Sequence, residues 1–404
     1  MLNKSIFFNN FFFKSKKFYQ NLKKTKKIFN SFQLDLKNFE IPLLKCYEKD
    51  YAFDFSPATV KKFSKYKNIV VIGMGGSVLG TKSIYSFLKT KVKKEVFFFD
   101  NLDENLHLQF NKINILKNSC FIIVSKSGNT LETITNFSVI FSKSLFKNKL
   151  IFITEIKDNV LNNIAHKFNA EIIEHKDFIG GRYSVLSEVG MFPAALMGLN
   201  IHKFQNLKKL IVDKNFVSSL IQNVASMYTL NIQGVKSSVI FNYDSSLNDL
   251  SLWYQQLVAE SLGKKGKGIT PILSFGPKDH HSVLQLYLDG PKDKFFTFIT
   301  TNHSNKGFVI NKDIMTEEKV NYLVNKKMGD LMQAAQQATL DTLGQNSIKF
   351  REIHIPIIDT YSIGSLMALS IIETVAACVY FEVNPFNQPA VEQGKRLTKQ
   401  YLRY

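Results

Sequence analysis

The sequence predicts an α/β protein with two doubly wound domains, each a mainly parallel sheet flanked by helices. From residue 68 onward, short apolar runs alternate with amphipathic helical stretches, which is typical of strands buried on both faces of a parallel sheet. The pattern stops near residue 200 and starts again near Ser237. With 404 residues, 45% of them hydrophobic and 21% charged, the chain is long enough for two domains with large cores.

We expect four segments along the chain. They are a basic helical segment over 1–45, a first domain over 46–205, a second domain over 206–384 and a helical tail over 385–404. In the two domains, the apolar runs predict strands at 69–72, 96–99, 121–124, 150–153, 238–241, 295–298 and 353–355.

Two segments resemble targeting or membrane sequences, and we interpret both as parts of the folded body. Residues 1–34 contain no acid and mix Lys with Phe, but they lack the long apolar core and the cleavage site of a secretory signal. We expect an amphipathic helix packed on the body there. The longest apolar stretch, 363–381, is interrupted by Glu373, so it predicts a buried core helix and no membrane partner.

The charge and cysteine content bear on partners and compartment. Lys and Arg number 52 against 33 acids, but only four of the 52 are arginines. Surfaces that bind nucleic acid usually rely on the planar fork of arginine, so we expect a solvated lysine surface and no nucleic-acid partner. Cys46, Cys120 and Cys378 share no disulfide or metal-ligand spacing, which indicates a reduced, cytoplasmic protein.

A glycine-rich segment from Gly73 to Gly80 lies between a predicted strand and a predicted helix. It fails the dinucleotide fingerprint because Val78 occupies the place of the last glycine, and it fails the Walker A pattern because Thr81 replaces the lysine. A tight turn remains, with Gly76 and Ser77 presented to a helix N-terminus. This favours either an anion site or a turn alone.

A second loop, Ser125-Lys126-Ser127-Gly-Asn-Thr130, also follows a strand and precedes a helix. Asn129 with Glu132 three residues later predicts a capping box. Capping needs neither the three hydroxyls nor the lysine, and these groups at a helix N-terminus suit one phosphate monoester.

Four further places hold candidate functional side chains. Arg182 follows two glycines, and Gln256 and Glu260 share one helix face. Glu260 lies in the last helical turn, where the dipole disfavours a carboxylate's charge, as suits a general base. Alone, a surface turn and a solvated glutamate explain these residues equally well. The other two places are His280-His281, without metal-ligand spacing, and a proline-framed turn from Asn384 that carries Gln388 and Lys395.

Together, these segments resemble the phosphoglucose isomerase (glucose-6-phosphate isomerase) family. Six family patterns match in order between residues 69 and 395: G-I-G-G-S-x-L-G, S-K-[ST]-x-x-T-x-E-T, G-G-R-[FY]-S, M-E-S-N-G-K, H-[SA]-[FL]-x-Q-[LM] and N-P-F-D-Q-[PW]-G-V-E-x-G-K. The chain departs from them where Leu262 replaces Asn, His280 replaces Gln and Ala390 replaces Gly. None of these departures removes a candidate site residue.

The resemblance implies two sugar-isomerase (SIS) domains, a homodimer, and neither metal nor cofactor. It implies interconversion of glucose 6-phosphate and fructose 6-phosphate through a cis-enediol, in glycolysis and gluconeogenesis. Glu260 would move the proton between C2 and C1, Arg182 would stabilise the enediolate, and Lys395 would open the ring with His281 of the neighbouring subunit. Substrate binding is implied for Gly76, Ser77, Ser125, Lys126, Ser127, Thr130, Gln256 and Gln388.

Four other functions share some of these features. An isomerase that accepts both glucose and mannose phosphates remains open, because the two substrates differ at C2. A non-catalytic SIS-domain sensor would not need Glu260, Arg182 and Lys395 together. A glutamine-dependent aminotransferase needs an N-terminal cysteine, and residues 1–45 contain none. A nicotinamide dehydrogenase is disfavoured by Val78.

Overall fold

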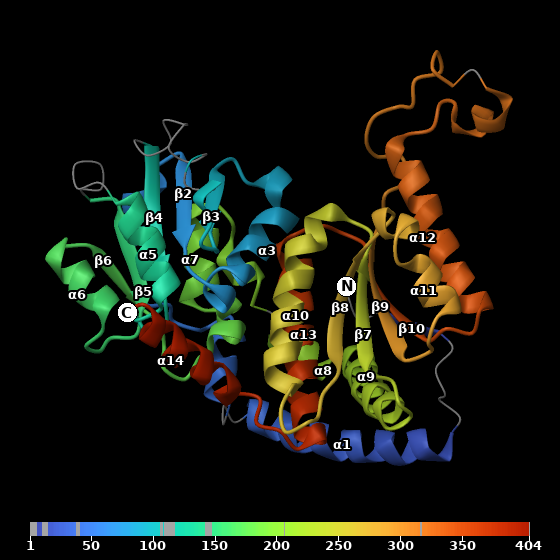
Figure 1. Ribbon diagram of the computed structural model, residues 1–404, viewed down its shortest axis with the longest axis horizontal. Helices are drawn as coiled ribbons and strands as arrows, with labels where there is room; N and C mark the ends of the chain where they lie inside the picture. Colours follow the sequence, from blue (N-terminus) through green and yellow to red (C-terminus); the bar gives the residue numbers. More distant parts are fainter. Residues whose placement is uncertain are drawn as a thin grey trace.

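The computed structural model describes residues 6–9, 15–37, 41–105, 108, 118–141, 148–205, 207–315 and 317–403. Two sheets of five strands stand next to each other, and helices cover both faces of each (Figure 1). This agrees with the predicted α/β architecture of two sheets.

The first sheet is entirely parallel and has the strand order β3-β2-β4-β5-β6. Its two inner strands β4 and β5 are buried at every position, because helices cover both faces. One face packs on α2, α3 and α7, and the other packs on α5 and α6. The bounds are β2 Asn68–Ile72, β3 Glu95–Phe99, β4 Ser119–Val124, β5 Leu150–Thr154, β6 Glu171–Glu174, α2 Pro57–Ser64, α3 Leu79–Phe87, α5 Leu131–Ile140, α6 Val160–Lys167 and α7 Glu188–Leu196.

The second sheet has the order β1-β10-β9-β7-β8, and only β1 runs antiparallel to its neighbour. Helices α9, α10 and α13 cover the face toward the first sheet, and α11 and α12 cover the other. The bounds are β1 Ile6–Asn9, β7 Ser237–Asn242, β8 Thr270–Phe275, β9 Lys294–Thr301, β10 Phe350–Ile355, α8 Leu207–Val212, α9 Lys214–Ile232, α10 Asn248–Leu262, α11 Leu284–Asp289, α12 Met328–Gln345 and α13 Thr360–Phe381.

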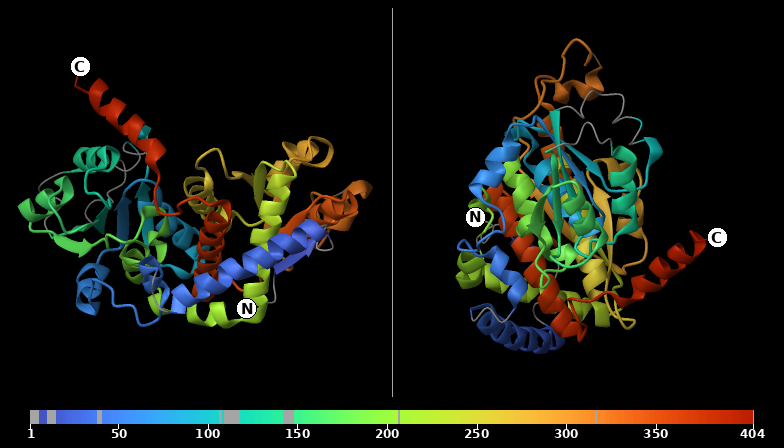
Figure 2. Two further views of the ribbon diagram at one scale, coloured as in Figure 1. Left: turned by 90° about the horizontal axis from the view of Figure 1, so that it is seen from below. Right: turned by 90° about the vertical axis from the view of Figure 1, so that its left-hand side faces the viewer.

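The terminal helices differ in how they meet the body. Helix α1 (Lys16–Lys37) buries Phe18 and Phe29 and packs along α9 and α13, as the amphipathic pattern predicts. Helix α14 (Glu392–Tyr401) has no buried residue and projects beside the first sheet (Figure 2). All seven predicted strands are present. The sequence did not predict β1, β6 and β8, which are short, flanked by acids, or interrupted by Pro271.

Helix α13 meets the length and hydropathy of a membrane span, but 89% of its apolar window is buried inside the fold. The core-helix prediction is therefore confirmed. Its central Glu373 forms a buried ion pair with Arg351 of β10 at 2.6 Å and accepts a hydrogen bond from Asn223 of α9 at 3.0 Å. Both charges of the pair are almost fully buried, so each depends on the other for compensation.

The variant Glu373→Gln is therefore expected to lower the free energy of unfolding by about 3–5 kcal/mol, because it leaves the Arg351 guanidinium buried without a counter-charge. Denaturant unfolding measures this loss. Glu382→Gln is the matched control, since Glu382 is exposed and pairs with Lys267 at 3.4 Å; it should cost less than about 1 kcal/mol. Equal losses in the two variants would contradict the role of the buried pair.

Candidate active site

Two loops meet at the carboxyl edge of the first sheet, because β2 and β4 are adjacent parallel strands. The glycine turn after β2 places Ser77 before α3, and Gly75 has φ +53°. A Cβ on Gly76 would lie 2.6 Å from the backbone nitrogen of Arg182 and closer still to the Gly181 carbonyl. Only glycine at this position lets the two backbones touch.

The variant Gly76→Ala is expected to push the Arg182 segment away from the glycine turn and to cost activity and stability together. We expect about 1–3 kcal/mol of lost stability, as for other overpacked sites, with at least a tenfold fall in turnover. Thermal unfolding and an isomerase assay measure the two effects. Gly181→Ala is the stability control, since its Cβ would have no atom within 4 Å. A Gly76→Ala protein as stable as this control would contradict the close contact.

The second loop, Ser125 to Thr130, leads from β4 into α5. The hydroxyls of Ser125 and Thr130 lie 2.8 Å apart and hydrogen-bond to each other, and Ser127 is exposed. The Lys126 ammonium donates to the Asp177 carbonyl at 2.6 Å and lies 3.6 Å from Glu155. The lysine therefore stands beside the loop with its charge already engaged.

The predicted capping box at this loop is wrong. Thr130, not Asn129, occupies the N-cap of α5, and its side chain makes no capping hydrogen bond. Asn129 instead accepts a hydrogen bond from the backbone of Val160 at 3.1 Å, because the loop packs on the start of α6. The start of α5 is thus left without a side-chain cap, which suits an anion bound there.

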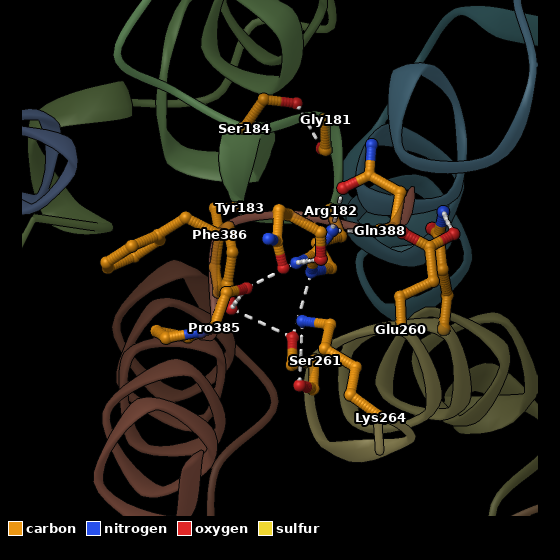
Figure 3. A network of polar contacts seen from close by, with 12 residues as sticks. Gly181, Arg182, Tyr183, Ser184, Glu260, Ser261, Lys264, Pro385, Phe386 and Gln388 are labelled. Carbon is orange, nitrogen blue, oxygen red and sulfur yellow. Dashed lines mark hydrogen bonds and ion pairs between the residues drawn. The ribbon is translucent and has the colours of Figure 1, made fainter. Parts of the chain in front are cut away.

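Arg182 is 3% exposed and stands at the centre of a polar network (Figure 3). A guanidinium has five N–H donors, and the network supplies an acceptor for each. Nη1 donates to Glu260 at 3.2 Å and to Gln388 at 3.0 Å, and Nε donates to the Ser261 hydroxyl at 2.8 Å. Nη2 donates to the carbonyls of Pro385 and, at 3.3 Å, Asn387. The arginine is held from two sides, by the end of α10 and by the turn before α14.

Glu260 lies in the last turn of α10, as predicted, and both of its carboxylate oxygens are engaged. Oε2 pairs with Arg182, and Oε1 accepts from Gln256 at 2.9 Å, one helical turn earlier. Its side chain is nevertheless 34% exposed. Glu260 and Gln388 line one cavity of about 700 Å³, so the carboxylate is both oriented and open to a ligand.

Lys395 lies on α14, where its ammonium pairs with Glu392 at 2.7 Å. A cavity of about 500 Å³ separates α14 from the second loop, and Ser127, Thr130 and Lys395 line it together. The C-terminal segment therefore borders both cavities, with Gln388 in one and Lys395 in the other.

The structure does not bring His281 to this site within one chain. It is exposed on a short helix, Lys278–His281, that leads into α11 on the far face of the second sheet. Its neighbour His280 is anchored, with Nε2 2.6 Å from the Tyr243 hydroxyl and 2.9 Å from that of Thr339. Burial lowers the pKa of His280.

Sequence reasoning gave no role to several groups that hold the site. Ser261 and Lys264 lie within the segment singled out for Glu260, but only the structure shows their bonds to Arg182 and to the C-terminal turn. The Tyr183 hydroxyl bonds to both Ser261 and the Pro385 carbonyl. The serine directly after the glutamate and the lysine four residues after it are the sequence signal for the first two, whereas main-chain acceptors carry no such signal.

No group of three or more His, Cys, Asp or Glu side chains suited to a metal occurs in the part of the chain that the structure describes. That activity needs neither metal nor cofactor stays a prediction. The three cysteines are free and buried, and burial raises the pKa of Cys120 and Cys378 to about 12.

Residues 52–403 match the family described as phosphoglucose isomerase. The chain belongs to this family. It is 34% identical to a glucose-6-phosphate isomerase of Methanocaldococcus jannaschii, over 86% of this chain and 88% of the relative. It is 31% identical to a glucose-6-phosphate isomerase of Campylobacter jejuni, over 83% of this chain and 85% of the relative. Family membership confirms the resemblance inferred from the six motifs.

Two solved structures share the fold of this phosphoglucose isomerase family member. A hypothetical protein from Thermus thermophilus superposes with a TM-score of 0.80 at 22% identity, covering 98% of this chain and 99% of that chain. A glucose-6-phosphate isomerase from Chlamydia trachomatis superposes with a TM-score of 0.70 at 19% identity, covering 94% of this chain and 74% of that chain. Both support the arrangement of two parallel sheets flanked by helices.

Proposed function

We propose that the chain interconverts glucose 6-phosphate and fructose 6-phosphate by moving a proton between C2 and C1 through a cis-enediol. The observation that carries this proposal is the pairing of Glu260 with the buried Arg182 at 3.2 Å, at the edge of a cavity that Gln388 also lines. A base and a fixed positive charge at one point are what a proton transfer beside a carbonyl needs.

In this reaction Glu260 takes the proton from C2 and returns it to C1. Gln256 and Arg182 each hold one carboxylate oxygen, so the base keeps one orientation. Negative charge develops on the sugar oxygens as the proton leaves, and the fixed positive charge of Arg182, 3.2 Å from Glu260, would stabilise it. Because Arg182 is buried, its charge acts with little screening by water.

The two loops of the first sheet would bind the substrate phosphate. Gly76, Ser77, Ser125, Lys126, Ser127 and Thr130 lie at adjacent carboxyl ends of β2 and β4. Backbone N–H groups, hydroxyls and the start of α5 together suit a phosphate monoester. Binding this remote group would hold C1 and C2 against Glu260.

Ring opening would involve Lys395 and the partner copy of His281 in a homodimer. His281 is exposed, and a long connection between β9 and α12 extends from the same half of the molecule (Figure 1). This connection and the start of α12 expose large apolar side chains, namely Phe308, Val309, Ile314, Tyr322, Met328 and Leu331. Such a patch is typical of a surface covered by another protein, and a second copy would cover it and supply the histidine.

The proposed function is tested by a coupled assay on the purified chain with fructose 6-phosphate and, separately, mannose 6-phosphate. Turnover of fructose 6-phosphate alone is the expected result. Comparable turnover of both sugars would favour the dual isomerase. Binding of both without turnover would overturn the proposal and favour a sensor. The buried free thiols support a reducing compartment, and we place the reaction in the cytoplasm.

A further inference from the structure

The turn that joins α13 to α14 is held through main-chain carbonyls, and apart from the Tyr183 hydroxyl, which donates to Pro385, the side chains that hold it are cations. Lys267 donates to the carbonyl of Phe381 at 3.0 Å, and Lys264 donates to that of Asn384. Arg182 donates to the next carbonyls along, those of Pro385 and Asn387. These hydrogen bonds to the backbone therefore fix the turn in the position from which Gln388 contacts Arg182.

Lys264 has a second bond that sets it apart from Lys267. Its ammonium also donates to the Ser261 carbonyl at 3.0 Å, in the last turn of α10 (Figure 3). The hydroxyl of that same Ser261 accepts from Arg182 Nε. One ammonium thus bridges the two elements that supply all five acceptors of the arginine, the end of α10 and the C-terminal turn.

We propose that Lys264 is a positioning residue for the isomerase reaction. Its ammonium fastens the C-terminal turn to the end of α10 and so holds the Arg182 guanidinium between Glu260 and Gln388. The inference rests on the proposed roles of Arg182 and Glu260. Lys264 lines the same cavity as Glu260, but both described bonds of its ammonium go to main-chain carbonyls, so the role assigned to it is positioning.

Burial and the nearby Arg182 charge both lower the pKa of Lys264. Holding a second cation close to a buried guanidinium is unfavourable unless carbonyl oxygens compensate both charges. A neutral side chain would avoid that repulsion but could not donate to two carbonyls at once with the same strength. The site therefore needs the positive charge at this position, and arginine is the substitute that preserves it.

The test compares Lys264→Met, which keeps the aliphatic stem, with Lys264→Arg, which keeps the charge and the donors. Lys264→Met is expected to lower kcat by about tenfold or more with KM changed by less than about threefold, since misplacing Arg182 weakens the transition state selectively. Lys264→Arg should recover at least half of the activity. Lys214→Met is the control for charge, because Lys214 is exposed at the start of α9 and lines neither of the two cavities, and it should retain wild-type kcat.

A second arm asks whether Lys264 acts through Arg182. In an Arg182→Lys background, the further change Lys264→Met is expected to cost less than about twofold, because groups that act as a unit are not additive. The same tenfold loss in both backgrounds would overturn the proposal, as would a rise in KM at unchanged kcat, which marks a substrate-binding lysine. Lys264→Gln replaces the methionine variant if circular dichroism shows that Lys264→Met is unfolded.

The outcomes separate this inference from the proposed function. A wild-type chain without isomerase activity would mean that the proposed function has failed. An active wild type with a Lys264→Met variant of equal kcat would overturn the positioning role alone. A kcat loss that Lys214→Met shares to the same extent would also overturn it, since the effect would then come from surface charge.

Discussion

The variant Glu260→Gln is expected to lose about 100-fold or more of kcat while binding sugar phosphate nearly as well as the wild type, because a positioned general base is removed and its shape is kept. The amide oxygen can still accept from Arg182 or from Gln256, so the arginine should stay in place. Initial rates in the coupled assay and calorimetric titration with fructose 6-phosphate measure the two quantities.

The control for this variant is Glu95→Gln, an exposed carboxylate at the start of β3 that pairs with Lys89. It removes the same charge without touching the network of Arg182 and should leave kcat unchanged. If Glu260→Gln retained more than about a tenth of the wild-type rate, the base would be another group.

Mixing two inactive variants is expected to restore about a quarter of wild-type activity. Glu260→Gln and His281→Ala chains, each nearly inactive alone, are unfolded and refolded together in equal amounts. Random pairing makes about half of the dimers mixed by two-fold symmetry. In each mixed dimer, one site receives both changes and the other receives neither. The exposed position of His281, on the short helix that leads into α11, motivates this arrangement.

Refolded samples of each variant alone are the control, and native mass spectrometry of a size-tagged chain reports how many mixed dimers form. A site contained within one chain could recover nothing, because every chain would still carry a lesion. Mixed dimers without recovered activity would therefore place His281 in its own subunit or outside the reaction.

Much of the fold was predictable because its central strands are continuous apolar runs. Strands such as β4 and β5 are buried on both faces, and this burial leaves a clear pattern in the sequence. The strand β8 was not predicted because Pro271 interrupts its pattern. β1 was not predicted because it gains its pairing from β10, more than 300 residues later.

The residues of the candidate site were predictable from the sequence, but the hydrogen bonds that join its distant segments were not. Helical spacing correctly placed Gln256 and Glu260 on one helix face. In the structure, Nε2 of Gln256 donates to Oε1 of Glu260 at 2.9 Å. The pairing of Arg182 with the C-terminal turn joins segments about 200 residues apart through main-chain carbonyls, which leave no signal in side-chain identity. The prediction of a capping box was wrong for a related reason. The side-chain oxygen of Asn129 accepts a hydrogen bond from the backbone of Val160, at the start of α6.

The role of Glu260 in moving the proton is tested most directly by the fate of hydrogen in D₂O. The wild-type enzyme and Glu260→Gln are each incubated with fructose 6-phosphate, and the glucose 6-phosphate formed is examined by proton NMR. A carboxylic acid formed on Glu260 exchanges with solvent, so the wild-type product is expected to carry deuterium at C2. Glu260→Gln should incorporate deuterium at least about 100-fold more slowly. Equal incorporation by both proteins would contradict proton transfer by Glu260.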